Sequence, residues 1–436
     1  MFSKTTLTIA LLIIFMMPAV AQEECPDTMA VDTLAQEEVP WDVRVKSQLE
    51  ILASEAENSY FNTGICVWDL TADSLLFGYN HHKVMRPAST QKILTAISAL
   101  SILGPRHEFR TRAYYTGTIT ADSVLYGDIY VVGDFDPMYS YSDLRELARS
   151  IGDLGVKQMN GCIYGDATMK SSDLYGNGWC WDDVPSKFEP PLCALMFDRG
   201  NLSPHSNSYS KDIMFNPAEH FVKVLSQEVG ELGITPLDSN AVSIDYALKA
   251  CPASDAHSFY IKTRTIEQVM QRMLKNSDNL HAEAVFFQLA HFNTGRNCTW
   301  KDGARQVENV LRKAGVNTSY VEVADGSGVS LYNYVSPSAE VAMLRYAYGT
   351  PDIHSYFYPA LPVAGRDGTL SDRMGTGNAN LNVHAKTGTL EGVISLCGYV
   401  KASNNHMLAF SVIHNGVLKA STARNYQDRL CQELAR

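Results

Sequence analysis

Ser89 and Lys92 lie three residues apart and could serve as a nucleophile and its base. A serine hydroxyl becomes nucleophilic when a base removes its proton, and a lysine in an apolar site loses part of its preference for charge. We expect a helix that opens at Ala88-Ser89, after Pro87, and stops at the Gly-Pro pair at 104–105. Helical spacing is seen in the apolar residues Ile93, Ala96, Ile97, Leu100 and Leu103. Ser89 and Lys92 would then share one face of its first turn, where the helix dipole favours developing negative charge.

Two more polar motifs follow along the chain. They are Ser277-Asp278-Asn279 and Lys386-Thr387-Gly388-Thr389. Each motif is weak by itself, because the S-x-x-K pattern recurs at 208–211 and the S-x-N pattern at 403–405. The first duplicate has no apolar helix behind it, and we interpret the second as a hairpin turn. The order of the three motifs, and the strands after Lys386, therefore favour Ser89 as the reactive serine.

The size and charge of the chain limit the classes of protein to which it can belong. Its 436 residues are enough for two or three domains with a sizeable core. Apolar residues make up 45% and charged residues 19%, as in an ordinary globular protein. The net charge is −11 and no basic run occurs, so we do not expect nucleic acid as a partner.

The first 21 residues have the pattern of a secretory signal peptide. Lys4 precedes an apolar stretch over 7–17, and Pro-Ala-Val-Ala at 18–21 ends in small residues. A membrane anchor is the alternative, but the apolar stretch is short for a bilayer span. We expect cleavage after Ala21, a flexible arm over 22–40, and export to the bacterial periplasm or cell envelope. The mature chain would be soluble or peripherally associated there.

Nine cysteines occur after the signal segment, so at least one is unpaired even if disulfides form after export. Cys66 and Cys397 lie in apolar, strand-like runs and are expected in the core. No pair has the spacing of zinc ligands, and we assign no bridge. We expect neither a metal nor an organic cofactor.

Periodicity predicts an α/β (α+β) fold. Helices are expected over 45–56, 142–151, 217–232, 266–275, 280–289, 303–314, 338–348 and 418–434. Strands are expected over 63–70, 74–80, 109–120, 124–132, 161–166, 392–401 and 406–414. The simplest organisation is one catalytic domain made of 41–105 and 251–436, interrupted by a mostly β insertion over 106–250 with two small subdomains.

The three motifs in this order resemble those of serine acyl-transfer enzymes related to penicillin-binding proteins and β-lactamases. The chain most resembles the class C low-molecular-mass penicillin-binding proteins, the peptidase S13 group of D-alanyl-D-alanine carboxypeptidases and endopeptidases. The separation of 188 positions from Ser89 to Ser277 also fits this group, since β-lactamases have a far shorter gap. Further similar stretches are 127–134, 178–183, 325–330, 361–370 and 384–390.

The resemblance implies a transpeptidase-like catalytic fold and a role for each motif residue. Ser89 would be the acylated nucleophile and Lys92 its general base, while Ser277 would relay a proton to the leaving amine. Asn279 would hold a substrate amide, and Lys386 and Thr387 would contact the terminal carboxylate of the substrate. Gly388 would let the substrate backbone lie along the strand. The backbone N–H groups of Ser89 and Thr389 would form the oxyanion hole.

We therefore expect an exported serine-type D-Ala-D-Ala carboxypeptidase or endopeptidase that cleaves peptidoglycan stem peptides and is acylated by β-lactams. One alternative is a β-lactamase-like or esterase hydrolase, although no acidic base loop follows Ser277. The other is a wall-binding scaffold without turnover. The balance of carboxypeptidase and endopeptidase activity stays open, as does the oligomeric state, including a homodimer.

Overall fold

A computed structural model describes residues 39–201, 216–252 and 254–436. The expected signal peptide, nearly all of the expected arm and the 208–211 duplicate lie outside these residues. None of the helices in the described ranges is long and apolar enough to cross a bilayer.

The first sheet is antiparallel, with strand order β12-β13-β14-β1-β2. Its strands are β1 (Asn62–Asp69), β2 (Ser74–Tyr79), β12 (His384–Leu390), β13 (Val393–Lys401) and β14 (Met407–Asn415). Strand β12, which carries the third motif, is therefore an edge strand. The 403–405 duplicate lies in the turn between β13 and β14, as expected.

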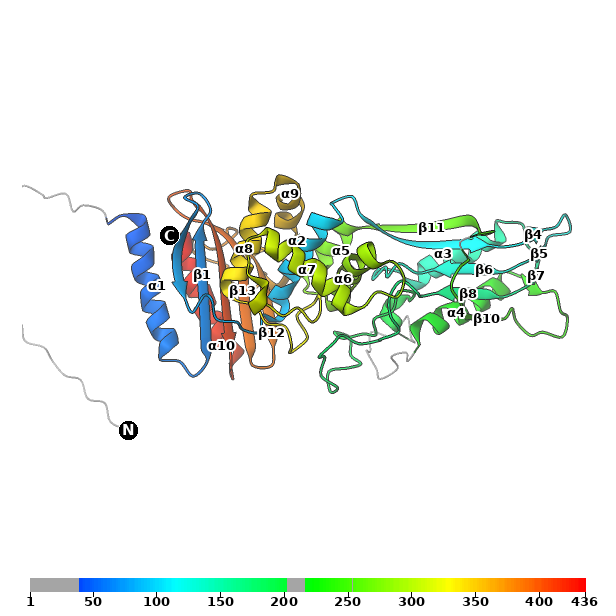
Figure 1. Cartoon of the computed structure of the whole chain (residues 1–436), viewed down its shortest axis with the longest axis horizontal. Coiled ribbons are helices and arrows are strands. Elements are labelled where there is room, and N and C mark those ends of the chain that lie inside the picture. Colours follow the sequence, from blue (N-terminus) through cyan, green and yellow to red (C-terminus); the bar gives the residue numbers. More distant parts are fainter. Residues whose placement is uncertain (1–38, 202–215, 253) are drawn as a thin grey trace, which may run out of the picture. The chain divides into compact units, whose positions relative to one another are not determined.

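The stretch between the first and second motifs contributes two other sheets (Figure 1). The second sheet has the order β10-β8-β6-β3-β11, with β3 (Glu108–Tyr115), β6 (Ile129–Val132), β8 (Ile163–Asp166), β10 (Tyr246–Leu248) and β11 (His257–Thr265). The third has the order β4-β5-β7-β9, with β4 (Thr118–Ile119), β5 (Val124–Tyr126), β7 (Gln158–Asn160) and β9 (Thr235–Pro236). The strand predicted over 109–120 is thus two strands in different sheets, separated by Gly117 with φ of +75°. Strand β11 lies beyond residue 250 yet pairs with β3, and the division of the chain into domains stays a prediction.

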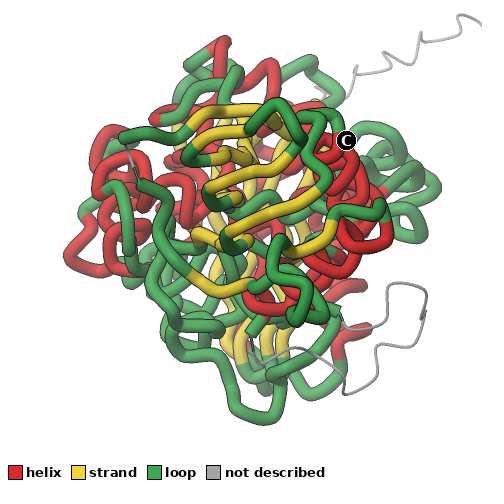
Figure 2. Tube along the Cα trace, turned by 90° about the vertical axis from the view of Figure 1, so that its right-hand side faces the viewer, coloured by secondary structure: helices red, strands yellow, loops and turns green. Residues whose placement is uncertain are grey.

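Helices flank the sheets, as the red segments on both sides of the strands show in Figure 2. The α-helices are α1 (Trp41–Glu57), α2 (Gln91–Ile102), α3 (Tyr141–Gly152), α4 (Pro217–Glu231), α5 (Ile266–Lys275), α6 (Asn279–Thr294), α7 (Trp300–Lys313), α8 (Pro337–Tyr348), α9 (Pro351–Ala360) and α10 (Ala420–Ala435). Short 3₁₀ turns are η1 (Ala88–Thr90), η2 (Asp198–Gly200), η3 (Thr318–Tyr320) and η4 (Gly368–Leu370).

Both faces of the first sheet are buried, because its strands alternate side chains between two separate cores. On one face, Ile65 and Val67 pack in a cluster with apolar residues of α1 and α10. On the other face, Cys66 and Cys397 pack in a cluster with residues of α2 and α8. Both cysteines are core residues, as predicted, and the eight cysteines in the described ranges are all unbridged. Strand β12 of this sheet packs against η1, so the first and third motifs lie side by side.

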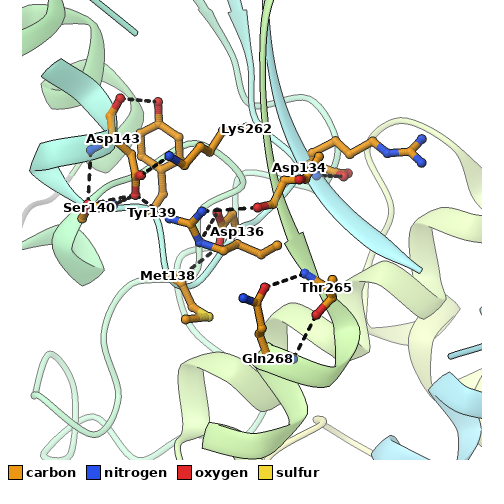
Figure 3. Close-up of polar contacts among 12 residues, drawn as sticks. Asp134, Asp136, Met138, Tyr139, Ser140, Asp143, Lys262, Thr265 and Gln268 are labelled. Carbon is orange, nitrogen blue, oxygen red and sulfur yellow. Dashed lines mark hydrogen bonds and ion pairs between the residues drawn. The ribbon is translucent and has the colours of Figure 1, made fainter. Parts of the chain in front are cut away.

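A partly buried charge cluster joins β11 of the second sheet to α3 (Figure 3). Asp143 accepts from Lys262 Nζ at 2.8 Å and from Arg264 Nη2 at 2.7 Å, and Arg264 also approaches Asp136 at 3.8 Å. Lys262 and Arg264 belong to β11, and α5 begins directly after β11 with a capping box between Thr265 and Gln268. Because Ser277 follows α5, the cluster fixes the segment that delivers the second motif.

Most of the predicted helices and strands are confirmed, with ends shifted by a few residues. Helix α9 was not predicted because Pro351 and Pro359 are helix-breaking signals in a sequence. Pro351 occupies the first turn of α9, where a missing N–H does no harm.

Candidate active site

Ser89 lies in the 3₁₀ turn η1, which leads directly into α2, rather than in the first turn of the α-helix. Ala88 has φ of +50°, a left-handed conformation that is unusual for a residue with a side chain. The turn is held from the first sheet, since Ser395 Oγ donates to Pro87 O at 2.5 Å. Ser89 remains half-buried, so its hydroxyl is accessible at the start of a buried helix.

The Nζ of Lys92 has three hydrogen-bond partners and is fully buried. They are Ser89 Oγ at 2.8 Å, Asn279 Oδ1 at 2.7 Å and Ser327 O at 2.7 Å. The last two are carbonyl oxygens, which only accept hydrogen bonds. A neutral amine has two hydrogens and one lone pair, so donating to both carbonyls leaves its lone pair for the Ser89 hydroxyl. The arrangement is that of a base beside its nucleophile.

Burial lowers the pKa of Lys92 to about 8, although the carboxylates of Asp325, Glu283, Asp278 and Glu189 act in the opposite direction. Burial, and secondarily the charge of Lys92, lowers the pKa of Lys386 well below its usual value. A substantial fraction of Lys92 is therefore neutral near physiological pH, as a general base requires.

The second motif bridges the two lysines. Ser277 lies between α5 and α6 with φ of +59°, and its Oγ accepts from Lys386 Nζ at 2.8 Å. Asp278 caps α6 by accepting from His281 N at 3.2 Å, which places Asn279 in the first turn of that helix. Ser277 thus faces Lys386 while Asn279 faces Lys92, so the structure brings the three motifs together.

The third motif lies on β12 beside Ser89. Lys386 is fully buried and also donates to Thr387 O at 2.6 Å, while Thr387 Oγ1 donates to Thr369 Oγ1 at 2.7 Å. Thr389 is exposed, and its hydroxyl accepts from Arg424 at 3.4 Å. The contacts of these residues with a substrate carboxylate, and the oxyanion hole, stay predictions.

The packing of β12 explains why a glycine occupies position 388, which was not predicted from the sequence. It pairs with Ser395 across β12 and β13. A Cβ at residue 388 would lie 2.0 Å from Ser395 Oγ, 2.8 Å from Pro87 O and 3.0 Å from Ser89 N. The missing side chain lets the Ser395 hydroxyl reach the turn and brings β12 close to the nucleophile.

Replacing Gly388 by alanine is therefore expected to slow acylation of Ser89 by about 100-fold, because displacing β12 by about 1 Å misplaces the groups around the nucleophile. The measurement is the rate of labelling by a fluorescent penicillin. Gly152→Ala is the matched control, since the added carbon would meet no atom within 4 Å apart from its chain neighbours and the backbone of its own helix. Wild-type labelling of Gly388→Ala would contradict the expected role of this contact.

The loop 325–330 supplies the Ser327 carbonyl that contacts Lys92, and two buried acidic side chains hold this loop. Glu283 Oε1 accepts from Gly326 N at 3.0 Å and from Ser327 N at 2.8 Å. Asp325 is 1% exposed and accepts from main-chain and side-chain donors. Burial, then the charge of Asp325, raises the pKa of Glu283 to about 8. Glu283 was not singled out from the sequence, because nothing local distinguishes it from other acidic residues on a helix.

The segment 178–201 also approaches the site. Trp179 Nε1 donates to Asp325 at 2.9 Å and so packs against the loop 325–330, whereas Trp181 is 87% exposed. Arg199 Nη1 contacts Asp278 at 2.7 Å. Glu189 Oε1 accepts from Asn279 Nδ2 at 3.2 Å, a contact that was not predicted from the sequence.

Comparison with known proteins accounts for this combination of motifs and fold. The model of the D-Ala-D-Ala carboxypeptidase 3 (S13) family matches residues 45–212 and 199–436. The chain belongs to this family. The S13 resemblance predicted from the three motifs is therefore confirmed.

Relatives of this S13 member include the D-alanyl-D-alanine carboxypeptidase DacB of Haemophilus influenzae, 26% identical over 415 residues that cover 81% of this chain and 85% of the relative. The D-alanyl-D-alanine carboxypeptidase of Actinomadura sp. (strain R39) is 27% identical over 426 residues, covering 81% and 78% of the two chains. Penicillin-binding protein 4 of H. influenzae has a solved structure with a TM-score of 0.76, at 24% identity over 88% of this chain and 98% of that one. A second structure of that protein is complexed with a β-lactam. The structural match confirms the predicted fold class.

Proposed function

We propose that this S13 member is an exported serine peptidase that cleaves the D-Ala-D-Ala bond of peptidoglycan stem peptides through an acyl-enzyme on Ser89. The observation that carries the proposal is the position of Lys92 Nζ, 2.8 Å from Ser89 Oγ with carbonyl oxygens on its other two hydrogen-bond directions. Family membership and the names of the relatives support the choice of substrate.

In the first half-reaction, neutral Lys92 takes the proton of Ser89 while Oγ attacks the carbonyl carbon of the penultimate D-alanine. Two backbone N–H groups, those of Ser89 and Thr389, would stabilise the oxyanion of the tetrahedral intermediate. When the C–N bond breaks, the proton that Lys92 took from Ser89 passes through the hydroxyl of Ser277 to the leaving amine. D-alanine departs, and Lys92 is neutral again. Support for this relay is the hydrogen bond between Ser277 and Lys386.

In the second half-reaction, a water molecule attacks the ester carbonyl and gives a proton to Lys92. The C–Oγ bond then breaks, and Ser89 recovers its proton. A β-lactam would acylate Ser89 in the same way, but its opened ring keeps the leaving amine tethered. The structure of the H. influenzae relative with a β-lactam supports this expectation.

The terminal carboxylate of the substrate would bind beside β12. Because Lys386 is fully buried, we propose that its charge acts mainly through the hydroxyl of Ser277, to which its Nζ donates. An arriving carboxylate would also favour the charged form of Lys386, whose pKa burial depresses.

Labelling and cleavage together test the proposal. The mature chain, from Gln22, is incubated with a fluorescent penicillin, with a stem pentapeptide ending in D-Ala-D-Ala and with a cross-linked muropeptide, beside the Ser89→Ala variant. We expect covalent labelling and release of D-alanine by the wild-type chain and neither by Ser89→Ala. Shortening of the cross-linked muropeptide would add endopeptidase activity. Labelling that persists in Ser89→Ala would overturn the assignment, and stable labelling without any cleavage would favour a wall-binding scaffold.

A further inference from the structure

We infer that Glu189 is a positioning residue of the catalytic centre: it fixes the side-chain amide of Asn279 so that the lone pair of Lys92 faces Ser89. The inference rests on the proposed acylation of Ser89 and deepens it. Glu189 precedes Asn279 by 90 positions and comes from the expected insertion, which is not expected to supply the acylation machinery.

The contacts of Glu189 place it one side chain away from the base. Its Oε1 accepts from Asn279 Nδ2 at 3.2 Å, and Asn279 Oδ1 accepts from Lys92 Nζ at 2.7 Å. Its other oxygen accepts the hydroxyl of Ser186, and Glu189 N donates to Ser186 Oγ at 3.1 Å. The half-buried carboxylate is therefore held by its own loop before it contacts Asn279.

The orientation of the Asn279 amide matters because its two ends have opposite hydrogen-bonding character. A carboxylate only accepts, so the contact with Glu189 selects the orientation in which the amide NH₂ faces Glu189 and the amide oxygen faces Lys92. In the reversed orientation, the NH₂ would face the amine of Lys92 and take its lone pair. That lone pair would then be lost to the Ser89 hydroxyl, and the amide oxygen would repel the carboxylate.

The charge of Glu189 has a smaller, separable effect. The charged or titratable groups that act on Lys92 are Asp278, which caps α6, Glu283 of α6, Asp325 of the loop 325–330, Lys386 of β12, and Glu189. The carboxylates favour protonated Lys92, and Lys386 opposes them. Removing only the charge of Glu189 should therefore make Lys92 neutral at a slightly lower pH.

Two substitutions separate the hydrogen bond from the charge. Glu189→Gln keeps a carbonyl that can accept from Asn279 but removes the charge, whereas Glu189→Ala removes both. The matched control is Glu228→Gln. Glu228 lies in α4, away from the site, and is 8% exposed. Like Glu189, it accepts a hydrogen bond from a hydroxyl group, here that of Tyr141. The measurements are the second-order rate of acylation by a fluorescent penicillin as a function of pH and the midpoint of thermal unfolding.

We expect Glu189→Ala to acylate about 10-fold more slowly or worse at every pH, with an unfolding midpoint close to that of the wild type. The acylation rate of Glu189→Gln at its high-pH plateau should stay within about threefold of the wild-type rate. The rising part of its pH profile should move to lower pH by about 0.3 pH units. Glu228→Gln should match the wild type in both respects.

If the wild type is labelled and Glu189→Ala is acylated at the same rate, this inference is overturned and the proposed function is not. Equally slow acylation by both Glu189 variants, with an unshifted pH profile, would also overturn it, because it would indicate a structural role only. If Glu189→Ala does not fold, the acylation rate of Glu189→Gln and the position of the rising part of its pH profile test the inference. A wild-type chain that takes no label would overturn the proposed function together with this inference.

Discussion

Lys92→Met is expected to lower the rate of acylation of Ser89 by about 1000-fold, because it removes the general base while filling the same buried space. In the wild type, acylation should rise as pH increases through about 8, since burial lowers the pKa of Lys92 to about 8 and only neutral lysine can accept the proton. This dependence should be absent from the residual activity of Lys92→Met.

The acylation rate with a fluorescent penicillin checks this prediction across the pH range. Lys170→Met is a suitable control, because Lys170 is also a buried lysine that donates to two carbonyl oxygens, those of Ser171 and Asp173. It should label within a fewfold of the wild type if the loss in Lys92→Met is chemical. An acylation rate of Lys92→Met that still rises with pH through about 8 would show that another group is the base.

Asp325→Ala is expected to destabilise the fold by about 4 kcal/mol, because several buried donors would lose a charged acceptor at once. Asp325 accepts from Gly328 N at 2.7 Å, Ser330 N at 2.6 Å, Asn333 Nδ2 at 2.7 Å and Trp179 Nε1 at 2.9 Å. The same change loosens the loop that presents the Ser327 carbonyl to Lys92. We therefore expect acylation to fall by about 10-fold or more, even under conditions where the variant is folded.

Urea unfolding of the two chains gives the loss of stability, and penicillin labelling below the transition gives the loss of activity. Asp122→Ala, which alters an exposed carboxylate between β4 and β5, is the control and should change stability by less than about 0.5 kcal/mol. A stability of Asp325→Ala equal to that of this control would mean that the loop is held by other contacts.

The sequence was sufficient for those parts of the site that are written as local patterns. Ser89 and Lys92 are joined by one turn of chain, so their spacing alone predicts that they meet. The helix after them, the helix over 280–289 and the two strands over 392–401 and 406–414 also follow from local periodicity. The order of the three motifs then pointed to the S13 family, which the family comparison confirms.

Only the tertiary structure decided which distant groups complete the environment of Lys92. The Ser327 carbonyl is 235 positions away and Asn279 is 187, and neither contact has a local signal. Glu283, Asp325 and Glu189 act through the burial and hydrogen bonds that packing gives them, and an isolated acidic residue in a sequence carries neither. Gly388 belongs to a predicted motif, but the need for a glycine at this position comes from the close approach of β12 to Ser89. The sequence by itself determined which groups we propose to react. The packing of far-separated segments determined the hydrogen bonds and the burial of Lys92, the proposed base.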